Sequence, residues 1–185
     1  MKRLIAALLA GLTLFALVGC SAGSKADSAA PKDYSQILHD ARTDEENEYD
    51  MIFTKGEDGK FTAIDGYSAE YEAGQLDDEV RNLMMPLLNL EDDMYTDLAA
   101  SVSSMMVRSY AVAIVKPAEG KTQDVVDALD AYVQSQQKSM EHYLEDQYQI
   151  ASAARVATVP TGEVVMVCCE DSDTVFENIK KALAA

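Results

Sequence analysis

The sequence predicts an α+β domain in which two helices pack on one face of a small antiparallel sheet, as a two-layer sandwich. Short runs of β-branched and other apolar residues at 110–115, 155–159 and 164–169 are typical of strands. Longer stretches at 122–144 and 172–183 repeat apolar residues at helical spacing. This order of strands and helices is typical of a fold in which the helices lie on one face of an antiparallel sheet.

The predicted strands are bounded by residues that favour turns. The run at 110–115 stops at Pro117, which has no backbone N–H to donate to a neighbouring strand. Residues 98–107 carry Ala, Ser, Met and Val, a composition compatible with a strand or a helix, and we expect them to form a strand that pairs with 109–116. A Pro-Thr-Gly turn at 160–162 joins the last two strands into a hairpin.

Each predicted helix has one apolar face and charges that suit its ends. The first is expected to be capped by Thr122 and places Val125, Leu129 and Tyr132 along one side. The second follows Asp171, with acidic residues near its start and lysines near its end, which suits the helix dipole. Each helix therefore offers one apolar stripe to a sheet.

An acidic segment of irregular or helical structure is predicted at 33–86, before the sheet. We expect a short helix at 34–42 and a second at 80–90, which a proline interrupts. Two apolar runs at 51–54 and 61–64 flank a Gly-Glu-Asp-Gly sequence, whose composition is that of a hairpin turn.

This acidic segment is expected to contribute little to the stable core. Between residues 33 and 75 no apolar periodicity is sustained, so each ordered residue buries little area. We therefore place the core domain at 87–185, with Leu129 and Val167 inside it and Phe53 in a peripheral layer.

Residues 1–19 are predicted to be a lipoprotein signal peptide, because a basic start precedes a short uncharged apolar run. That run is shorter than the ~20 residues that a membrane-spanning helix needs. It ends in Leu17-Val18-Gly19-Cys20, which resembles the lipobox of bacterial lipoproteins, where the cysteine receives a diacylglycerol before cleavage. Residues 20–32 are then the lipidated Cys20 and a flexible tether. The prediction is a chain anchored in the cell membrane through Cys20, on the extracytoplasmic face.

The composition argues against nucleic acid as a partner and leaves few cysteines with a possible role. The chain has 32 acidic and 15 basic residues and a formal net charge of −17, so nucleic acid is not an expected partner. If Cys20 carries lipid, only Cys168 and Cys169 remain, and we expect two free thiols on opposite faces of a strand, one buried and one nearer the surface.

Four segments resemble the domain-of-unknown-function (DUF) 4358 family. They are residues 87–94 (LLNLEDDM), 110–121 (YAVAIVKPAEGK), 143–148 (YLEDQY) and 164–171 (VVMVCCED). The resemblance extends over residues 87–183 and implies a small lipoprotein of Gram-positive bacteria, with this domain after a lipobox. Because the shared motifs are structural, the resemblance implies no activity and no catalytic residue.

No set of side chains predicts a catalytic, metal or cofactor site. The acidic cluster at 44–50 lacks the ligand spacing and glycine of a calcium loop, and that at 91–93 sits where a helix start would attract acids. His142 lies on the predicted long helix, where Glu141 and Glu145 share a face, but neither a second histidine nor a cysteine is nearby in the sequence. Cys20 is thus the one residue to which we assign a role, as the lipidation site.

Three functions remain open from the sequence. The first is a non-enzymatic domain that binds an unknown protein or small ligand. The second is a calcium-binding surface protein, suggested by the 18 acidic residues between 40 and 97. The third is a cell-wall-active enzyme that uses paired carboxylates, which would need two of them facing each other in a cleft, one with a raised pKa.

Overall fold

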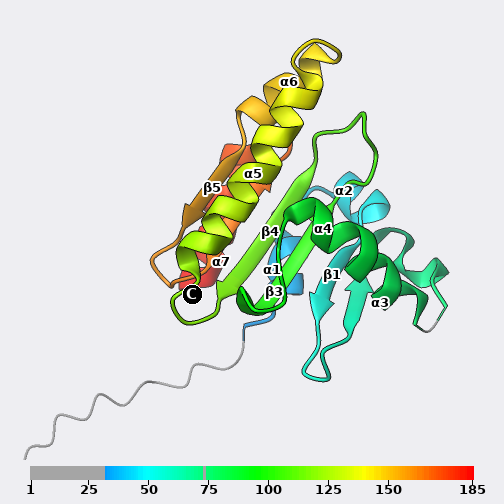
Figure 1. Cartoon of the computed structure of the whole chain (residues 1–185), viewed down its shortest axis with the longest axis vertical. Helices are drawn as coiled ribbons and strands as arrows, with labels where there is room; N and C mark the ends of the chain where they lie inside the picture. The colour runs from blue at the N-terminus through cyan, green and yellow to red at the C-terminus, as the bar shows by residue number, and fades with distance from the viewer. Residues whose placement is uncertain (1–31, 73) are drawn as a thin grey trace, which may run out of the picture. The chain divides into compact units, whose positions relative to one another are not determined.

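A six-stranded antiparallel sheet forms the centre of the computed structural model, which describes residues 32–72 and 74–185 (Figure 1). The strand order is β2-β1-β3-β4-β6-β5. The strands are β1 (Ile52–Lys55), β2 (Phe61–Ile64), β3 (Tyr95–Val102), β4 (Ala111–Pro117), β5 (Arg155–Thr158) and β6 (Val164–Cys168). The predicted α+β class with an antiparallel sheet is confirmed.

The three central strands are apolar along almost their whole length. Ala113 of β4 lies opposite Ala100 of β3 on one side and Met166 of β6 on the other. The predicted pairing between 98–107 and 109–116 is confirmed for β3 and β4, although β3 ends at Val102 and the residues that follow form a loop. The hairpin predicted at 155–169 is present as β5 and β6.

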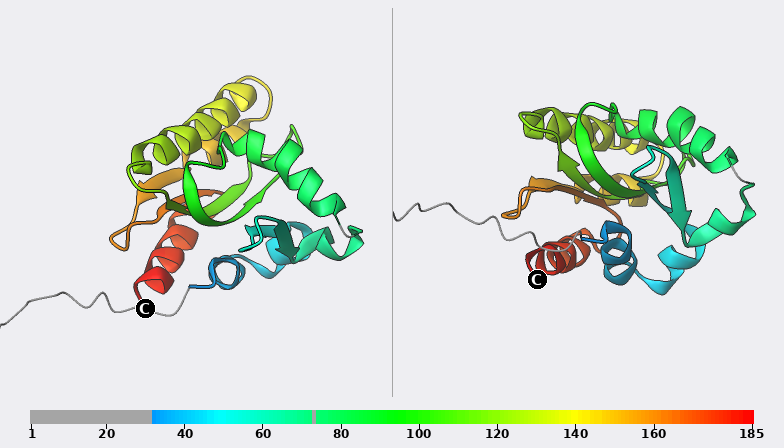
Figure 2. Two further views of the ribbon diagram at one scale, coloured as in Figure 1. Left: turned by 60° about the horizontal axis from the view of Figure 1, so that its bottom comes forward. Right: turned by 90° about the horizontal axis from the view of Figure 1, so that it is seen from below.

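Helices cover both faces of the sheet (Figure 2). One face is covered by α5 (Thr122–Met140), together with α4 (Met85–Leu88) and the π-helical turn η2 (Val80–Met84). The other is covered by α1 (Tyr34–Ala41) and α7 (Ser172–Ala184). The shorter helices are α2 (Asp44–Tyr49), η1 (Gly66–Glu70), α3 (Gln75–Glu79) and α6 (Glu145–Ser152).

The prediction that both main helices pack on one face is therefore wrong. Leu129 of α5 belongs to the apolar cluster that includes Ala113 and Met166, whereas Ile179 of α7 belongs to the cluster that includes Val112 and Val165. Successive residues of a strand point to opposite faces, so a strand that is apolar at every position needs a cover on each side. The uninterrupted apolar runs of β4 and β6 already carried this information.

The acidic segment at 33–86 is built into the same sheet. The predicted hairpin is present as β1 and β2, and Phe53 of β1 lies opposite Ala100 of β3. Phe53 is fully buried, which corrects its expected peripheral position. The described residues form one compact unit, so the predicted boundary at residue 87 does not separate two bodies among them.

Two smaller features complete the fold. Thr122 was expected to cap α5, but the cap position is Lys121, whose side chain makes no capping hydrogen bond. Among residues 32–72 and 74–185, no helix is both long enough and apolar enough to cross a membrane.

Candidate functional site

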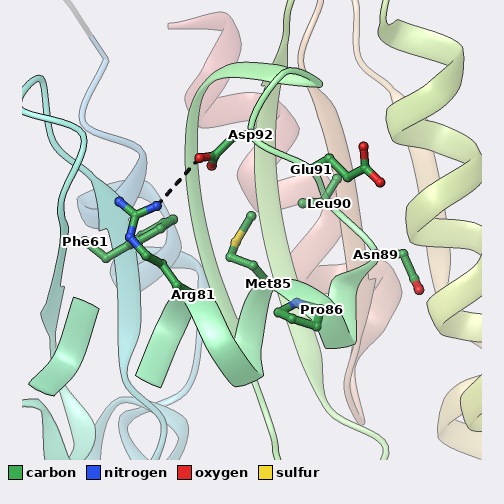
Figure 3. A pocket seen from close by; sticks show the side chains of 8 residues that line it. All are labelled: Phe61, Arg81, Met85, Pro86, Asn89, Leu90, Glu91 and Asp92. Atoms are coloured by element: carbon green, nitrogen blue, oxygen red, sulfur yellow. Dashed lines mark ion pairs between the residues drawn. The ribbon is translucent and has the colours of Figure 1, made fainter. Parts of the chain in front are cut away.

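A groove of about 410 Å³ opens beside η2 and α4, and we call it the Arg81 groove (Figure 3). The residues that line it come from the start of β2, from η2 and α4, and from the loop before β3. They are Phe61, Arg81, Met85, Pro86, Asn89, Leu90, Glu91 and Asp92. Phe61, Met85 and Leu90 are buried and form an apolar floor, whereas Glu91 and Asp92 are exposed at the rim.

The local sequence explains the shape of this wall. The backbone N–H of Met85 donates to the carbonyl of Val80, five residues earlier, which gives the wider π-helical turn. Pro86 follows at once and has no N–H, so it fits the start of the new helix α4 rather than the interior of an old one. Asn89 ends α4 in a left-handed conformation, with φ of 56°. The predicted helix at 80–90 is present as η2 and α4, but Pro86 does not interrupt it, since η2 runs directly into α4 with helical backbone at Met84 and Met85.

The Arg81 guanidinium is held in place from several sides. Its Nε lies 2.9 Å from Asp77 Oδ2 and its Nη1 lies 3.6 Å from Asp92 Oδ2. The guanidinium carbon stacks over the Phe61 ring, 5.2 Å from the ring centre. The hydrogen bond from Arg81 lowers the pKa of Asp77 and raises that of Arg81, with smaller contributions from neighbouring groups.

Asp92 is the most heavily paired carboxylate of the groove. It accepts hydrogen bonds from Lys55 Nζ at 2.8 Å and from the Tyr95 hydroxyl at 3.0 Å. The bond from Lys55 is the main reason why the pKa of Asp92 is lowered. Burial and the bond to Asp92 raise the pKa of Tyr95. The charges on this side of the groove are thus satisfied within the protein, in the folded state at neutral pH.

The two rim carboxylates do not face each other. In Figure 3, Asp92 points toward Arg81, whereas Glu91 points away from it, toward the side of α5. A catalytic pair would need a carboxyl with a raised pKa next to an ionised one, and the pKa of Asp92 is lowered. The groove therefore combines an apolar floor with fixed charges, which suits binding better than proton transfer.

A second polar cluster lies near the far end of β3 and centres on Arg42, whose side chain is fully buried. Arg42 Nη1 donates to Ser101 Oγ at 3.0 Å and to the Tyr110 hydroxyl at 3.1 Å. Arg42 Nη2 donates to Asp65 Oδ2 at 3.2 Å, and the same oxygen lies 2.8 Å from His39 Nδ1. These bonds tie α1 to β3 and β4. The cluster is a structural cross-link, because its polar atoms are used by one another.

Sequence reasoning missed this cluster. Arg42 is one of four basic residues among the 18 acidic residues between 40 and 97, and no role was predicted for it. The one available signal was its position at the end of the short helix predicted at 34–42. Asp65 gave a weaker signal in the pair Asp65-Gly66, where both residues adopt positive φ.

The structure places the two C-terminal cysteines in the core. Cys168 and Cys169 are free thiols, as predicted, but both are buried, so the expectation that one lies near the surface is wrong. Burial raises the pKa of each thiol to about 12. Cys169 is covered because its N–H binds Ser172 Oγ, which brings the start of α7 over it. Cys20, the predicted lipidation site, lies outside the described residues.

The other predicted acidic and histidine positions are spread over the surface. Residues 44–49 form α2, begun by a capping box between Thr43 and Glu46, and Asp50 pairs with Arg108. His142 is 88% exposed in the side chain and follows α5, which ends at Met140, so Glu141 and Glu145 do not share a helix face as expected. In the described part of the chain, no three His, Cys, Asp or Glu side chains lie together as a metal site would need.

One comparison with known proteins gave a match. The family model described as "Domain of unknown function (DUF4358)" matches residues 67–169. The match starts 20 residues earlier than the resemblance recognised in the sequence and includes η2 and α4, but it stops before α7. No curated protein and no solved structure matches the chain.

Proposed function

The chain belongs to the DUF4358 family, and we propose that it is an extracytoplasmic lipoprotein whose folded domain is a non-enzymatic binding domain. One observation carries the location: the sequence Leu17-Val18-Gly19-Cys20 directly after a short uncharged apolar run. Lipid on Cys20 anchors the chain in the cell membrane, and the polar residues before Lys32 join the anchor to the domain.

The geometry of the Arg81 groove supports binding as the role of the domain. Its floor of Phe61, Met85 and Leu90 is apolar, and Arg81 and Asp92 are fixed by ion pairs rather than left free to exchange protons. Small-molecule and peptide sites combine such an apolar surface with a few oriented polar groups. A cell-wall-active enzyme with paired carboxylates has no support from the pair Glu91 and Asp92, for the reasons given above.

The location is tested with the full-length chain in cells. Cells making the wild-type chain or Cys20→Ser are grown with a fatty-acid probe, and membranes are separated from soluble material. We expect label and membrane association for the wild type and neither for Cys20→Ser. Cys168→Ala is the matched control, because it removes a cysteine of the folded domain, and it should keep the label. Persistent labelling of Cys20→Ser would refute the anchor.

The binding role is tested at the groove itself. A mixed library of short peptides and small metabolites, screened by ligand-observed NMR against the domain, should give hits that Arg81→Met weakens. Arg155→Met is the matched control, because Arg155 pairs with acids on the opposite side of the sheet from the groove. Hits that are insensitive to Arg81→Met would remove the groove from the proposal.

A further inference from the structure

Three consecutive apolar side chains are exposed at the tip of the β3–β4 connection, and we call Met105, Met106 and Val107 the Met106 turn. Their exposed fractions are 55%, 90% and 52%. The central positions of tight turns normally carry Gly, Asn, Asp or Ser. A run of three exposed apolar residues is unfavourable in water and is not explained by the fold.

Hydrogen bonds and an ion pair fix both ends of the Met106 turn. Arg108 N donates to the carbonyl of Met105 at 3.1 Å, and Ser103 N donates to the carbonyl of Tyr110 at 3.0 Å. Both guanidinium nitrogens of Arg108 bind Asp50, at 2.6 and 2.7 Å, and the guanidinium stacks over the Tyr110 ring. A binding element that is already ordered loses little conformational entropy when a partner binds.

The Met106 turn lies at the end of the sheet away from the N-terminal entry of the chain. Lys32, the first described residue, donates a hydrogen bond to the carbonyl of Leu183 near the C-terminus and lies 4.0 Å from Glu163. Strand β4 runs from Ala111, next to the turn, to Pro117 at the other end, and Figure 1 shows the C-terminus at that second end. A membrane anchor that precedes Lys32 therefore joins the domain at the end opposite the turn.

The surface around the turn is mainly acidic. The start of α6 and the residue after α5 contribute the exposed carboxylates of Glu141, Glu145 and Asp146. The basic groups at this end are Lys138, in the last turn of α5, and Arg108, whose charge is paired with Asp50. Tyr143, 74% exposed, adds a further apolar surface between these helices, and Ser109 N binds Gln147 Oε1 to connect the loop to α6. Acidic surroundings disfavour both anionic lipid and a second copy of a chain whose net charge is −17.

We propose that the Met106 turn is the docking point for a protein partner that offers an apolar pocket with a basic rim. Met106 enters the pocket, Met105 and Val107 cover its edge, and the carboxylates beside Tyr143 face the basic side chains. Methionine suits this role because its unbranched side chain adapts to an apolar pocket. The inference rests on the proposed anchor only for the direction in which the turn points, away from the membrane.

The test uses the full-length chain in the cells that naturally make it. A diazirine amino acid replaces Met106, or Glu119 as a control, since Glu119 is exposed at the opposite end of β4. On illumination, position 106 should give one discrete adduct with another protein, and position 119 should not. The captured protein, once identified and purified, should bind the domain at least tenfold more weakly after Met106→Ser, and more weakly in high salt. Tyr67→Ser, at a side chain with 53% exposure, should leave binding unchanged.

Each other outcome overturns the proposal. Adducts with lipid would make the turn a membrane contact, and adducts with the chain itself would make it a self-association surface. Equal yields at 106 and 119, no adduct, or binding unaffected by Met106→Ser would remove the turn as a docking point. The two proposals can fail independently. If Cys20 takes up no fatty-acid label but position 106 still gives a specific adduct, the proposed lipid anchor is wrong and the proposed docking point stands.

Discussion

Residues 33–86 add the strand pair β1–β2 at one edge of the sheet and the short helix α1, whereas residues 87–185 supply four strands and the two longest helices, α5 and α7. Phe53 and Leu129 represent the two regions, and both are fully buried. They also belong to one apolar cluster, on the α5 face of the sheet. The difference teaches that a segment with no sustained periodicity can still be integral, when its few apolar residues add a strand pair to an existing sheet edge.

The largest expected effect compares these two side chains directly. Phe53→Ala should lower the free energy of unfolding by about 3–5 kcal/mol and Leu129→Ala by about 2–5 kcal/mol, because each leaves a cavity in a closed core. Denaturant unfolding of the chain beginning at Lys32 measures both. Tyr67→Ala, at an exposed position, serves as the control and should change little. A cost for Phe53→Ala below about 1 kcal/mol would show that residues 33–86 are peripheral.

A somewhat smaller effect is expected for the polar link between the regions. Arg42→Met removes the bonds to Ser101, Tyr110 and Asp65, and we expect a loss of about 3 kcal/mol. This loss of stability is at the low end of the range for breaking a buried ion pair, because Asp65 is partly exposed and can be hydrated. Lys180→Met breaks one exposed ion pair, with Glu177, and should cost less than about 1 kcal/mol in the same measurement. Equal costs would mean that the Arg42 cluster does not join the regions.

Two carboxylates, one from each region, should give pH dependences of opposite sign. Arg81 lowers the pKa of Asp77 in the folded state, so Asp77 stabilises the fold above its ordinary pKa of 3.8, and this stabilisation is lost as pH falls. Burial raises the pKa of Asp97, so its ionisation destabilises the fold at neutral pH and protonation relieves this as pH falls. Between about pH 6 and 3, the free energy of unfolding should therefore depend less steeply on pH in Asp77→Asn than in the wild type. In Asp97→Asn the dependence should be steeper than in the wild type. The same change of slope in both variants would contradict these assignments.

The smallest effect is expected for calcium. The carboxylates of Asp50, Asp65, Asp77 and Asp92 are engaged by basic side chains of the domain, which leaves no rigid oxygen cage among them. Titration calorimetry should show at most affinity in the range of about 10⁻³ M, as for carboxylates outside a preformed loop. Binding near 10⁻⁶ M would give the acidic segment a function that residues 87–185 lack, and would favour the calcium-binding alternative.

Most elements of the fold could be predicted from the sequence, because each is encoded locally. The β-branched runs of β4 and β6 and the apolar spacing of α5 and α7 gave elements that the structure confirms. The hairpin of β1 and β2 followed from its turn composition and from the two apolar runs that flank it. Helical spacing could not show on which face of the sheet each helix packs, because α5 and α7 each have one apolar side. The number of sheet faces that must be buried follows only from the apolar pattern of the strands.

The candidate site was less accessible to sequence reasoning. Pro86 predicted a break in the helix at 80–90 that the structure does not have, and the groove also needs Phe61, which the β1–β2 hairpin brings beside Arg81. The Arg42 cluster joins residues from 39 to 110, and nothing in their spacing relates them. Both features arise from tertiary contacts across the sheet, which a single sequence does not display.

Native-state hydrogen exchange tests most directly whether residues 33–86 are integral to the fold. The measurement compares backbone amides in β1, between Ile52 and Lys55, with those in β4, between Ala111 and Pro117, in the chain beginning at Lys32. We predict that the most protected amides of both strands exchange only through global unfolding, with the same free energy and the same dependence on denaturant. Exchange of all β1 amides through a separate opening of lower free energy, while β4 stays protected, would contradict this account.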